Sequence, residues 1–273
     1  MAEKAERIGV EKTRLDSTSL MVLGALAGAF IAFGSMFSIV VTTGAEGLPY
    51  GVTRLLSGLV FSLGLILVIV GGAELFTGNN LMVMACASGR VHMREVLRAW
   101  GLVYVGNFVG SVGIALLVFL AAGYSHSGGA VGIVALASAD AKASFSAAQA
   151  LVHGVLANIL VCLATWLCYS ARTTTDKILA IVPPIAGFVA MGFEHSIANM
   201  YLFSFALLTK FVGPGAFWDV IGRTPAAFPH LTMLATLSNL FWVTLGNMIG
   251  GMLVGITYWF IYLRGPKAVP PKP

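Results

Sequence analysis

The sequence predicts an all-α polytopic membrane protein whose six transmembrane helices form two inverted three-helix repeats. Three observations predict this fold. Of the 273 residues, 58% are hydrophobic and 10% are charged, whereas a soluble domain carries about 25% charged residues. Several apolar runs exceed the roughly 20 residues that a helix needs to cross a bilayer. A short polar motif also recurs in both halves of the chain.

The elements follow from the apolar runs in order. A polar, amphipathic N-terminal segment is expected over residues 1–18, which begin "MAEKAERIGVEKTRLDS". One membrane domain is expected over 19–263, with spans near 19–41, 52–88, 99–122, 147–170, 178–209 and 232–263. Residues 123–146 are expected to form an external loop rich in Ala, Gly and Ser, and 210–231 a structured external loop. The tail, 264–273, is expected in the cytoplasm, and its "GPKAVPPKP", residues 265–273, is expected to be disordered.

The basic residues predict the orientation of the spans. With both termini in the cytoplasm, twelve of the 16 Lys and Arg residues lie inside, and only Arg54, Lys142, Lys210 and Arg223 lie outside. This bias agrees with the positive-inside rule. The N-terminus lacks the basic-then-apolar pattern of a cleaved signal peptide. The sequence therefore indicates a multi-pass protein of the inner (plasma) membrane.

The recurring motif is Gly-x-Glu-x-x-x-x-Asn. It comprises Gly72, Glu74 and Asn79, and 120 residues later Gly192, Glu194 and Asn199. Three spans is an odd number, so the second half enters the membrane from the opposite face. Transporters built from such inverted repeats place the substrate path at the repeat interface, where interrupted helices line it.

Helix-breaking residues gather around both copies of the motif. Gly71, Gly72 and Gly78 predict a break in the second span, and Pro183, Pro184, Gly187 and Gly192 predict one in the fifth. Helix ends inside a membrane offer free N–H groups and a positive dipole end, which suit an anion.

Few residues in the apolar runs carry chemistry. A buried charge such as Glu74 or Glu194 suggests function by default, but we favour a structural role in which each accepts backbone N–H bonds at its break. His195 could shuttle a proton, since histidine titrates near neutral pH. A neutral, hydrogen-bonded histidine is the alternative, and we favour that alternative for His153. Lys142 is either a solvated lysine or an anion attractor at a pore mouth.

Other polar and apolar side chains surround these groups. Thr77, Asn79, Asn158 and Asn199 could bond a substrate, the histidine or free backbone groups. Core packing is the usual role of apolar neighbours, but at a pore they would form dry gates. These neighbours are Phe61, Leu65, Leu75, Phe76, Val161 and Phe188.

Several classes of site are not indicated. Cys86, Cys162 and Cys168 form no CxxC pair and are expected to be buried thiols. The glycines of "GNFVGSVG" and "GNMIGG" match small-residue helix packing rather than phosphate binding. We therefore expect no metal, cofactor, nucleic-acid partner, ATP-driven pump or enzyme.

Three longer stretches carry a family resemblance. "GGAELFTGN", "GVLANILVCLATW" and "GFEHSIANM" resemble signatures of the formate/nitrite transporter family, in order and over nearly the whole chain. "SLGLILV", "MACASGRV", "CYSARTTTDK" and "TYWFIYLR" are most similar to its formate branch. The resemblance implies an aquaporin-like six-helix channel domain, a homopentamer, and one pore in each protomer.

The resemblance also implies roles for single residues. It makes His195 the central pore histidine, facing Thr77, with Asn158 lining the path and Lys142 in a vestibule. Leu65, Leu75 and Phe188 would be constrictions, with Phe61, Phe76 and Val161 beside them. The expected substrate path and proton relay comprises His195, Thr77, Asn158, Asn199, Lys142 and Glu194, while Gly72, Glu74 and Asn79 would be structural.

The function implied is bidirectional transport of formate and related small monovalent anions. In this hypothesis His195 protonates the anion, which couples formate to a proton at low pH; in a competing version the anion stays charged. The alternatives are a nitrite or hydrosulfide channel of the same fold, and a membrane anchor of a respiratory enzyme, with His153 and His195 as candidate haem ligands. A soluble formate-metabolising enzyme could dock at the N-terminus.

Overall fold

The regular structure of the chain is helical throughout residues 1–265, the part that the computed structural model describes. Most of the tail for which disorder is predicted, residues 266–273, lies outside this part. The helices are α1 (Ala2–Thr13), α2 (Ser17–Thr42), α3 (Tyr50–Gly71), α4 (Phe76–Asn79), α5 (Val83–Ala87), α6 (Met93–Leu120), α7 (Ala130–Ala143), α8 (Ala147–Cys168), α9 (Thr174–Ala190), α10 (Ser196–Val212), α11 (Gly215–Ile221) and α12 (Met233–Tyr262). Three 3-10 turns lie between them: η1 (Asn80–Met82), η2 (Gly123–Ser125) and η3 (Pro225–Ala227).

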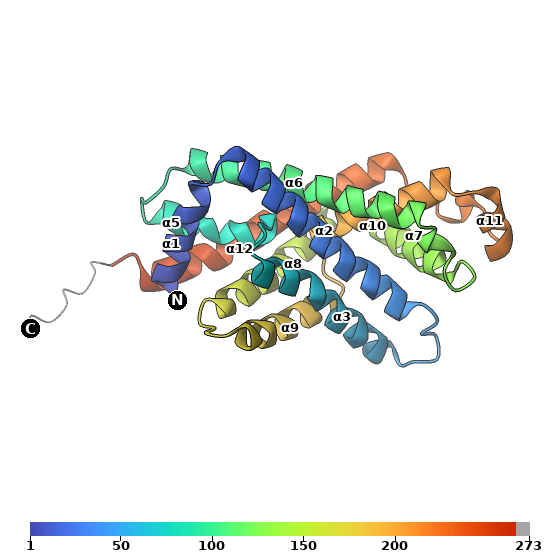
Figure 1. Ribbon diagram of the computed structural model, residues 1–273, viewed down its shortest axis with the longest axis horizontal. Helices are drawn as coiled ribbons and strands as arrows, with labels where there is room; N and C mark the ends of the chain where they lie inside the picture. The colour runs from blue at the N-terminus through green and yellow to red at the C-terminus, as the bar shows by residue number, and fades with distance from the viewer. Residues whose placement is uncertain (266–273) are drawn as a thin grey trace, which may run out of the picture.

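The long helices lie where the apolar runs predict them. Within residues 1–265, α2, α3, α6, α8 and α12 are each long and apolar enough to cross a membrane. The fifth predicted span is divided into α9 and α10, of 17 residues each. In Figure 1 the N-terminus and the end of α12 lie at one end of the molecule, and α7 and α11 lie at the other.

The two halves of the chain pack in the same way. Helix α2 packs against α3 and α6, α8 packs against α9 and α12, and α3 meets α9 between the halves. Glycines allow the closest approaches: a Cβ at Gly110 would lie 1.9 Å from the carbonyl oxygen of Ala25, and one at Gly246 would lie 2.1 Å from that of Leu151. The predicted small-residue packing is therefore correct.

Both predicted breaks are present. Gly72 has φ 76° after the end of α3, and Gly192 has φ 77° after the end of α9. Glycine adopts this left-handed conformation without the steric cost that a Cβ adds. The prolines do not break the chain as predicted: Pro183 and Pro184 lie inside α9, which continues to Ala190. The second break instead lies between Ala190 and Ser196 and contains Gly192.

The segment predicted as an Ala, Gly and Ser loop is largely helical. Its residues 130–143 form α7, which packs on α10 and buries Val131, Ala135, Leu136 and Ala139. Alanine is the best helix former, and an apolar face against α10 stabilises the helix. The segment 210–231 is structured as predicted, and the Lys210 ammonium donates to the carbonyls of Phe228 and Leu231 at 2.7 and 2.8 Å.

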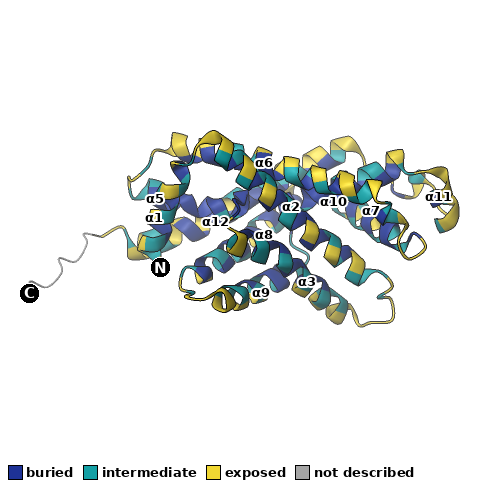
Figure 2. Ribbon diagram, in the orientation of Figure 1, coloured by how far each residue is buried: buried dark blue, intermediate teal, exposed yellow. Residues whose placement is uncertain are grey.

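The outer sides of the long helices are largely apolar. Exposed side chains include Phe33 and Phe37 on α2 and Leu117 on α6. Figure 2 shows exposed positions along the outer sides of the helices and buried ones between them. Soluble monomers rarely expose such extended apolar surface, so these flanks suit lipid or a neighbouring chain.

Candidate functional site

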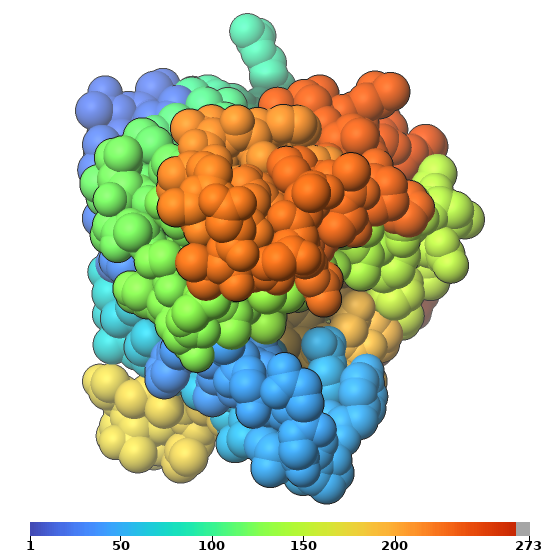
Figure 3. All heavy atoms as spheres, turned by 90° about the vertical axis from the view of Figure 1, so that its right-hand side faces the viewer, coloured from blue at the N-terminus to red at the C-terminus, as the bar shows by residue number. Residues whose placement is uncertain are grey.

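Two cavities lie on opposite sides of the helix breaks. The first, here called the α1 cavity, has a volume of about 270 Å³; Lys12 of α1, Leu65 and Leu75 are among its lining residues. The second, the α7 cavity, has a volume of about 340 Å³ and is lined in part by Phe61, Lys142, Phe188 and His195. In Figure 3 the surface at the α7 end is hollowed between the α2–α3 segment and α7.

Apolar side chains separate the cavities. Phe61 and Phe188 meet edge to face, with ring centroids 5.5 Å apart, on the side of the α7 cavity. Leu65 lies one helical turn after Phe61 and, with Leu75, faces the α1 cavity. All four belong to one buried cluster. A bare ion crosses such a constriction only at a large dehydration cost.

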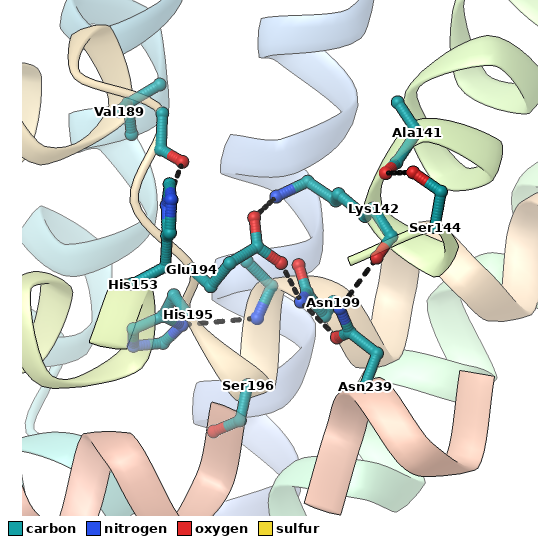
Figure 4. A network of polar contacts seen from close by, with 12 residues as sticks. Ala141, Lys142, Ser144, His153, Val189, Glu194, His195, Ser196, Asn199 and Asn239 are labelled. Atoms are coloured by element: carbon teal, nitrogen blue, oxygen red, sulfur yellow. Dashed lines mark hydrogen bonds and ion pairs between the residues drawn. The ribbon is translucent and has the colours of Figure 1, made fainter. Parts of the chain in front are cut away.

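Thr77 and His195 join the two broken helices between the cavities. The Thr77 hydroxyl oxygen lies 2.9 Å from Nε2 of His195, and both residues are buried. Nδ1 of His195 accepts the backbone N–H of Ala198 at 3.2 Å, so His195 caps the N-terminus of α10 (Figure 4). A backbone N–H can only donate, which places the ring hydrogen of the neutral imidazole on Nε2. Nε2–H therefore donates to Thr77.

This cap constrains protonation of the ring. A second proton on Nδ1 of His195 would face the hydrogen of the Ala198 amide, because both groups would then be donors. The imidazolium form therefore requires the α10 cap to open or the ring to turn. In the conformation observed, His195 is a neutral hydrogen-bond donor through Nε2.

Each repeated glutamate is part of a Lys–Glu–Asn set. At the first break, Glu74 accepts from Lys12 at 2.8 Å and from the side-chain amide of Asn79 at 2.7 Å. At the second, Glu194 is paired with Lys142 and accepts from the Asn199 amide at 2.7 Å (Figure 4). The Glu194 side chain is 1% exposed. The expectation that these carboxylates accept backbone N–H bonds is wrong, since lysine and asparagine side chains are their partners.

Two other asparagines hold the broken backbone. Oδ1 of Asn107 accepts the N–H of Phe76 at 2.9 Å, and its amide donates to the carbonyls of Gly24 and Glu74 at 2.7 and 2.9 Å. Asn107 lies on α6 and is fully buried. It therefore satisfies backbone groups that have no helical partner at the first break.

Asn247 on α12 does the same at the second break. It accepts the N–H of Ser196 at 2.9 Å and donates to the carbonyls of Gly154 and Glu194 at 2.8 and 3.0 Å. The sequence patterns above predict neither the roles of these two asparagines nor the pairing of Lys12 with Glu74. The signal available was the Gly-Asn pair that opens both "GNFVG" and "GNMIGG".

Some residues that were expected along the path line neither cavity. Asn158 lines neither cavity; its amide donates to the carbonyls of Thr77 and Asn247 and to Oδ1 of Asn80. Phe76 packs edge to face against Trp100 and Tyr104 of α6. Phe76 and Val161 also line neither cavity, so the constriction consists of Phe61, Leu65, Leu75 and Phe188.

The second histidine is bound to the backbone. Nδ1 of His153 lies 3.1 Å from the carbonyl oxygen of Gly192, and its ring stacks on Phe145. This geometry agrees with a structural role, in which the ring stabilises the second break through the carbonyl of Gly192. No group of three or more His, Cys, Asp or Glu side chains within residues 1–265 is placed to hold a metal ion.

Comparison with known proteins gives a consistent result. The family model described as "Formate/nitrite transporter" matches residues 1–260. The chain is 43% identical over 266 residues to "Formate channel FocA" of Escherichia coli (strain K12), covering 97% of this chain and 93% of that protein.

Solved structures show the same fold. "Pentameric formate channel with formate bound" superposes with a TM-score of 0.86 at 42% identity, covering 91% of this chain and 98% of the other. "FNT family ion channel" superposes with a TM-score of 0.81 at 30% identity, covering 95% of this chain and 98% of the other.

Proposed function

The chain belongs to the formate/nitrite transporter family, and we propose that it conducts formate and similar small monovalent anions in both directions through one passage per chain. The observation that carries this proposal is the Thr77–His195 hydrogen bond at the junction of two cavities, each with a lysine at its glutamate. The named relatives are channels rather than enzymes, so the function is transport and not catalysis.

Entry of the anion is governed by charge. Lys142 lines the α7 cavity and Lys12 lines the α1 cavity, with the side chain of each 26% exposed. A partly exposed ammonium in a cleft raises the local concentration of anions. The paired glutamates limit the net charge, so a monovalent anion is attracted without being held tightly.

Passage through the constriction depends on the central pair. Nε2–H of His195 and the hydroxyl of Thr77 provide hydrogen bonds in place of water where Phe61, Phe188, Leu65 and Leu75 exclude it. At neutral pH, His195 acts as a neutral donor to the anion.

At low pH we propose that transport is coupled to protons. Protonation of Nδ1 of His195 releases the Ala198 N–H, and the imidazolium then gives its Nε2 proton to formate. Formic acid crosses the dry constriction as a neutral molecule. The ring, now neutral with its hydrogen on Nδ1, takes up a proton at Nε2 and releases the one on Nδ1 to water, which restores the starting tautomer, and the α10 cap closes again.

Assembly and location follow from the family. We propose a homopentamer in the inner membrane, because a relative of 42% identity is a pentameric channel. We also propose a domain organisation of an N-terminal segment over 1–18, a channel domain over 19–263 and a tail over 264–273. Both termini are assigned to the cytoplasm from the positive-inside bias. A soluble formate-metabolising enzyme is the proposed partner at α1.

The test is formate flux into proteoliposomes across a pH series for wild type and His195→Asn. Asparagine can still cap α10 but does not titrate. We expect the variant to carry formate without co-moving protons. Unchanged pH dependence in the variant would refute the relay, and flux of nitrite or hydrosulfide without formate would refute the substrate. A haem absorbance band in purified protein would favour the anchor alternative.

A further inference from the structure

The α1 cavity contains more positive charge than its own carboxylate can balance. Lys4, Lys12 and Lys177 all line it. Among the described lining residues Glu74 is the single carboxylate, and its partner is Lys12 at 2.8 Å. Two ammonium groups, those of Lys4 and Lys177, therefore remain without a carboxylate partner within residues 1–265.

These two lysines flank the end of α8. The Lys4 ammonium donates one hydrogen bond to the carbonyl of Tyr169 at 3.0 Å, and the carbonyl of Lys177 accepts from the Cys168 thiol at 3.7 Å. Cys168 and Tyr169 also line the cavity. An ammonium has three donors, so Lys4 retains two for a ligand. Both lysines are only partly exposed.

The α7 cavity has a smaller excess of positive charge. Its lysine, Lys142, is paired with Glu194. Its arginine, Arg54, donates to the carbonyls of Val189 and Ala190 at the end of α9. The two cavities are related by the repeat in their Lys–Glu–Asn sets, but among the described lining residues the α1 side has two cations without a carboxylate partner, Lys4 and Lys177, and the α7 side has one, Arg54.

We propose that the α1 cavity is a binding site for a small dianion, such as a three-carbon dicarboxylate or a small phosphate, with Lys4 and Lys177 as its charge partners. The cavity of about 270 Å³ exceeds the ~30 Å³ share of one water several-fold, which leaves room for such a molecule. A dianion does not pass Leu65 and Leu75, because dehydrating two charges costs far more than dehydrating one. It therefore blocks the passage from the α1 side.

The test uses malonate as the dianion in proteoliposomes that import formate. The orientation of the protein is determined from protease access to the N-terminus, and malonate is placed on one side at a time. We expect inhibition from the α1 side alone, with acetate at the same concentration inhibiting far less. Lys177→Gln and Lys4→Gln should each raise the half-inhibitory malonate concentration at least fivefold.

Arg94→Gln is the matched control, since Arg94 is an exposed cation on the first turn of α6, which begins at the α1 end. Its half-inhibitory concentration should equal that of wild type. If Arg94→Gln raised the half-inhibitory malonate concentration as much as Lys177→Gln, inhibition would depend on surface charge in general, and the proposed site would be wrong. Inhibition from both sides, or none from the α1 side, would overturn it as well.

A binding measurement separates this site from the proposed transport. Malonate, and in a parallel series inorganic phosphate, is titrated into detergent-solubilised protein while Tm is recorded. A saturable rise in Tm that Lys177→Gln abolishes and Arg94→Gln retains supports the site even if no formate flux is found. A rise with one anion alone identifies carboxylate or phosphate as the ligand group, and a rise with neither overturns the proposal.

Discussion

Asn107 and Asn247 make matching sets of three hydrogen bonds in the two halves of the molecule. Each accepts one backbone N–H at the start of a helix after a break, Phe76 for α4 and Ser196 for α10. Each donates to the carbonyl of the repeated glutamate, Glu74 or Glu194. The two asparagines thus hold the two breaks with equivalent hydrogen bonds.

Replacing either asparagine should destabilise the protein. Asn247→Ala leaves one buried N–H and two buried carbonyls without this partner, at roughly 1–3 kcal/mol for each unsatisfied group. We expect Tm in detergent to fall by about 5 °C or more, with loss of formate flux. Val109→Ala, on the exposed surface of α6, is the control and should leave both unchanged. A Tm within 1 °C or so of wild type for Asn247→Ala would contradict this account.

Removing the central hydroxyl should slow conduction. Thr77→Val keeps the shape of the side chain but leaves Nε2–H of His195 without its partner at 2.9 Å. We expect formate flux to fall roughly tenfold, as one lost hydrogen bond at a dry barrier implies. Thr77→Ser retains the hydroxyl and should retain most of the flux. Equal flux in the valine and serine variants would show that the hydroxyl has no part in passage.

The Lys142 and Glu194 charges should be coupled. Lys142→Met leaves the buried Glu194 carboxylate unpaired, which in fully buried pairs costs about 3–5 kcal/mol and costs less here because Lys142 is partly exposed. The substitution also removes the positive charge that balances Glu194, which leaves a net negative charge beside the anion path. Lys142→Met/Glu194→Gln removes both charges, so we expect it to recover stability and part of the flux. Additive losses of Tm in the double variant would argue against direct pairing.

Asp16, the N-cap of α2, should make the stability of the protein depend on pH. A hydrogen bond from the Ser19 hydroxyl, followed by one from the Ser19 N–H, lowers the pKa of Asp16 below its ordinary 3.8. Since the folded pKa is the lower one, the stabilisation is present above about pH 4 and is lost as the pH falls through the folded pKa. We expect the difference in Tm between wild type and Asp16→Asn to shrink between pH 5 and pH 2.5 or so. A difference that stays constant over this range would exclude Asp16 as the titrating group.

The sequence predicts the spans and the breaks well because these depend on local properties. Hydropathy over a run of 20 or so residues decides whether a helix suits the membrane. The conformation of Gly72 and of Gly192 depends on the missing side chain of that residue alone. The prediction of a break at Pro183 was wrong because it used a local rule alone. Helix α9 continues through Pro183, and its packing against α3 and α8 stabilises it there.

By itself, the sequence determined the membrane class, the places of the long apolar helices and the two broken helices. The tertiary structure alone decided that Lys12 is the partner of Glu74, that Asn107 and Asn247 hold the breaks, and that Nδ1 of His195 caps α10. Hydrogen bonds and ion pairs form over a few ångströms between residues that are far apart in the chain, 62 positions for Lys12 and Glu74. Which partners come within that range is set by helix packing, and composition and periodicity do not encode it.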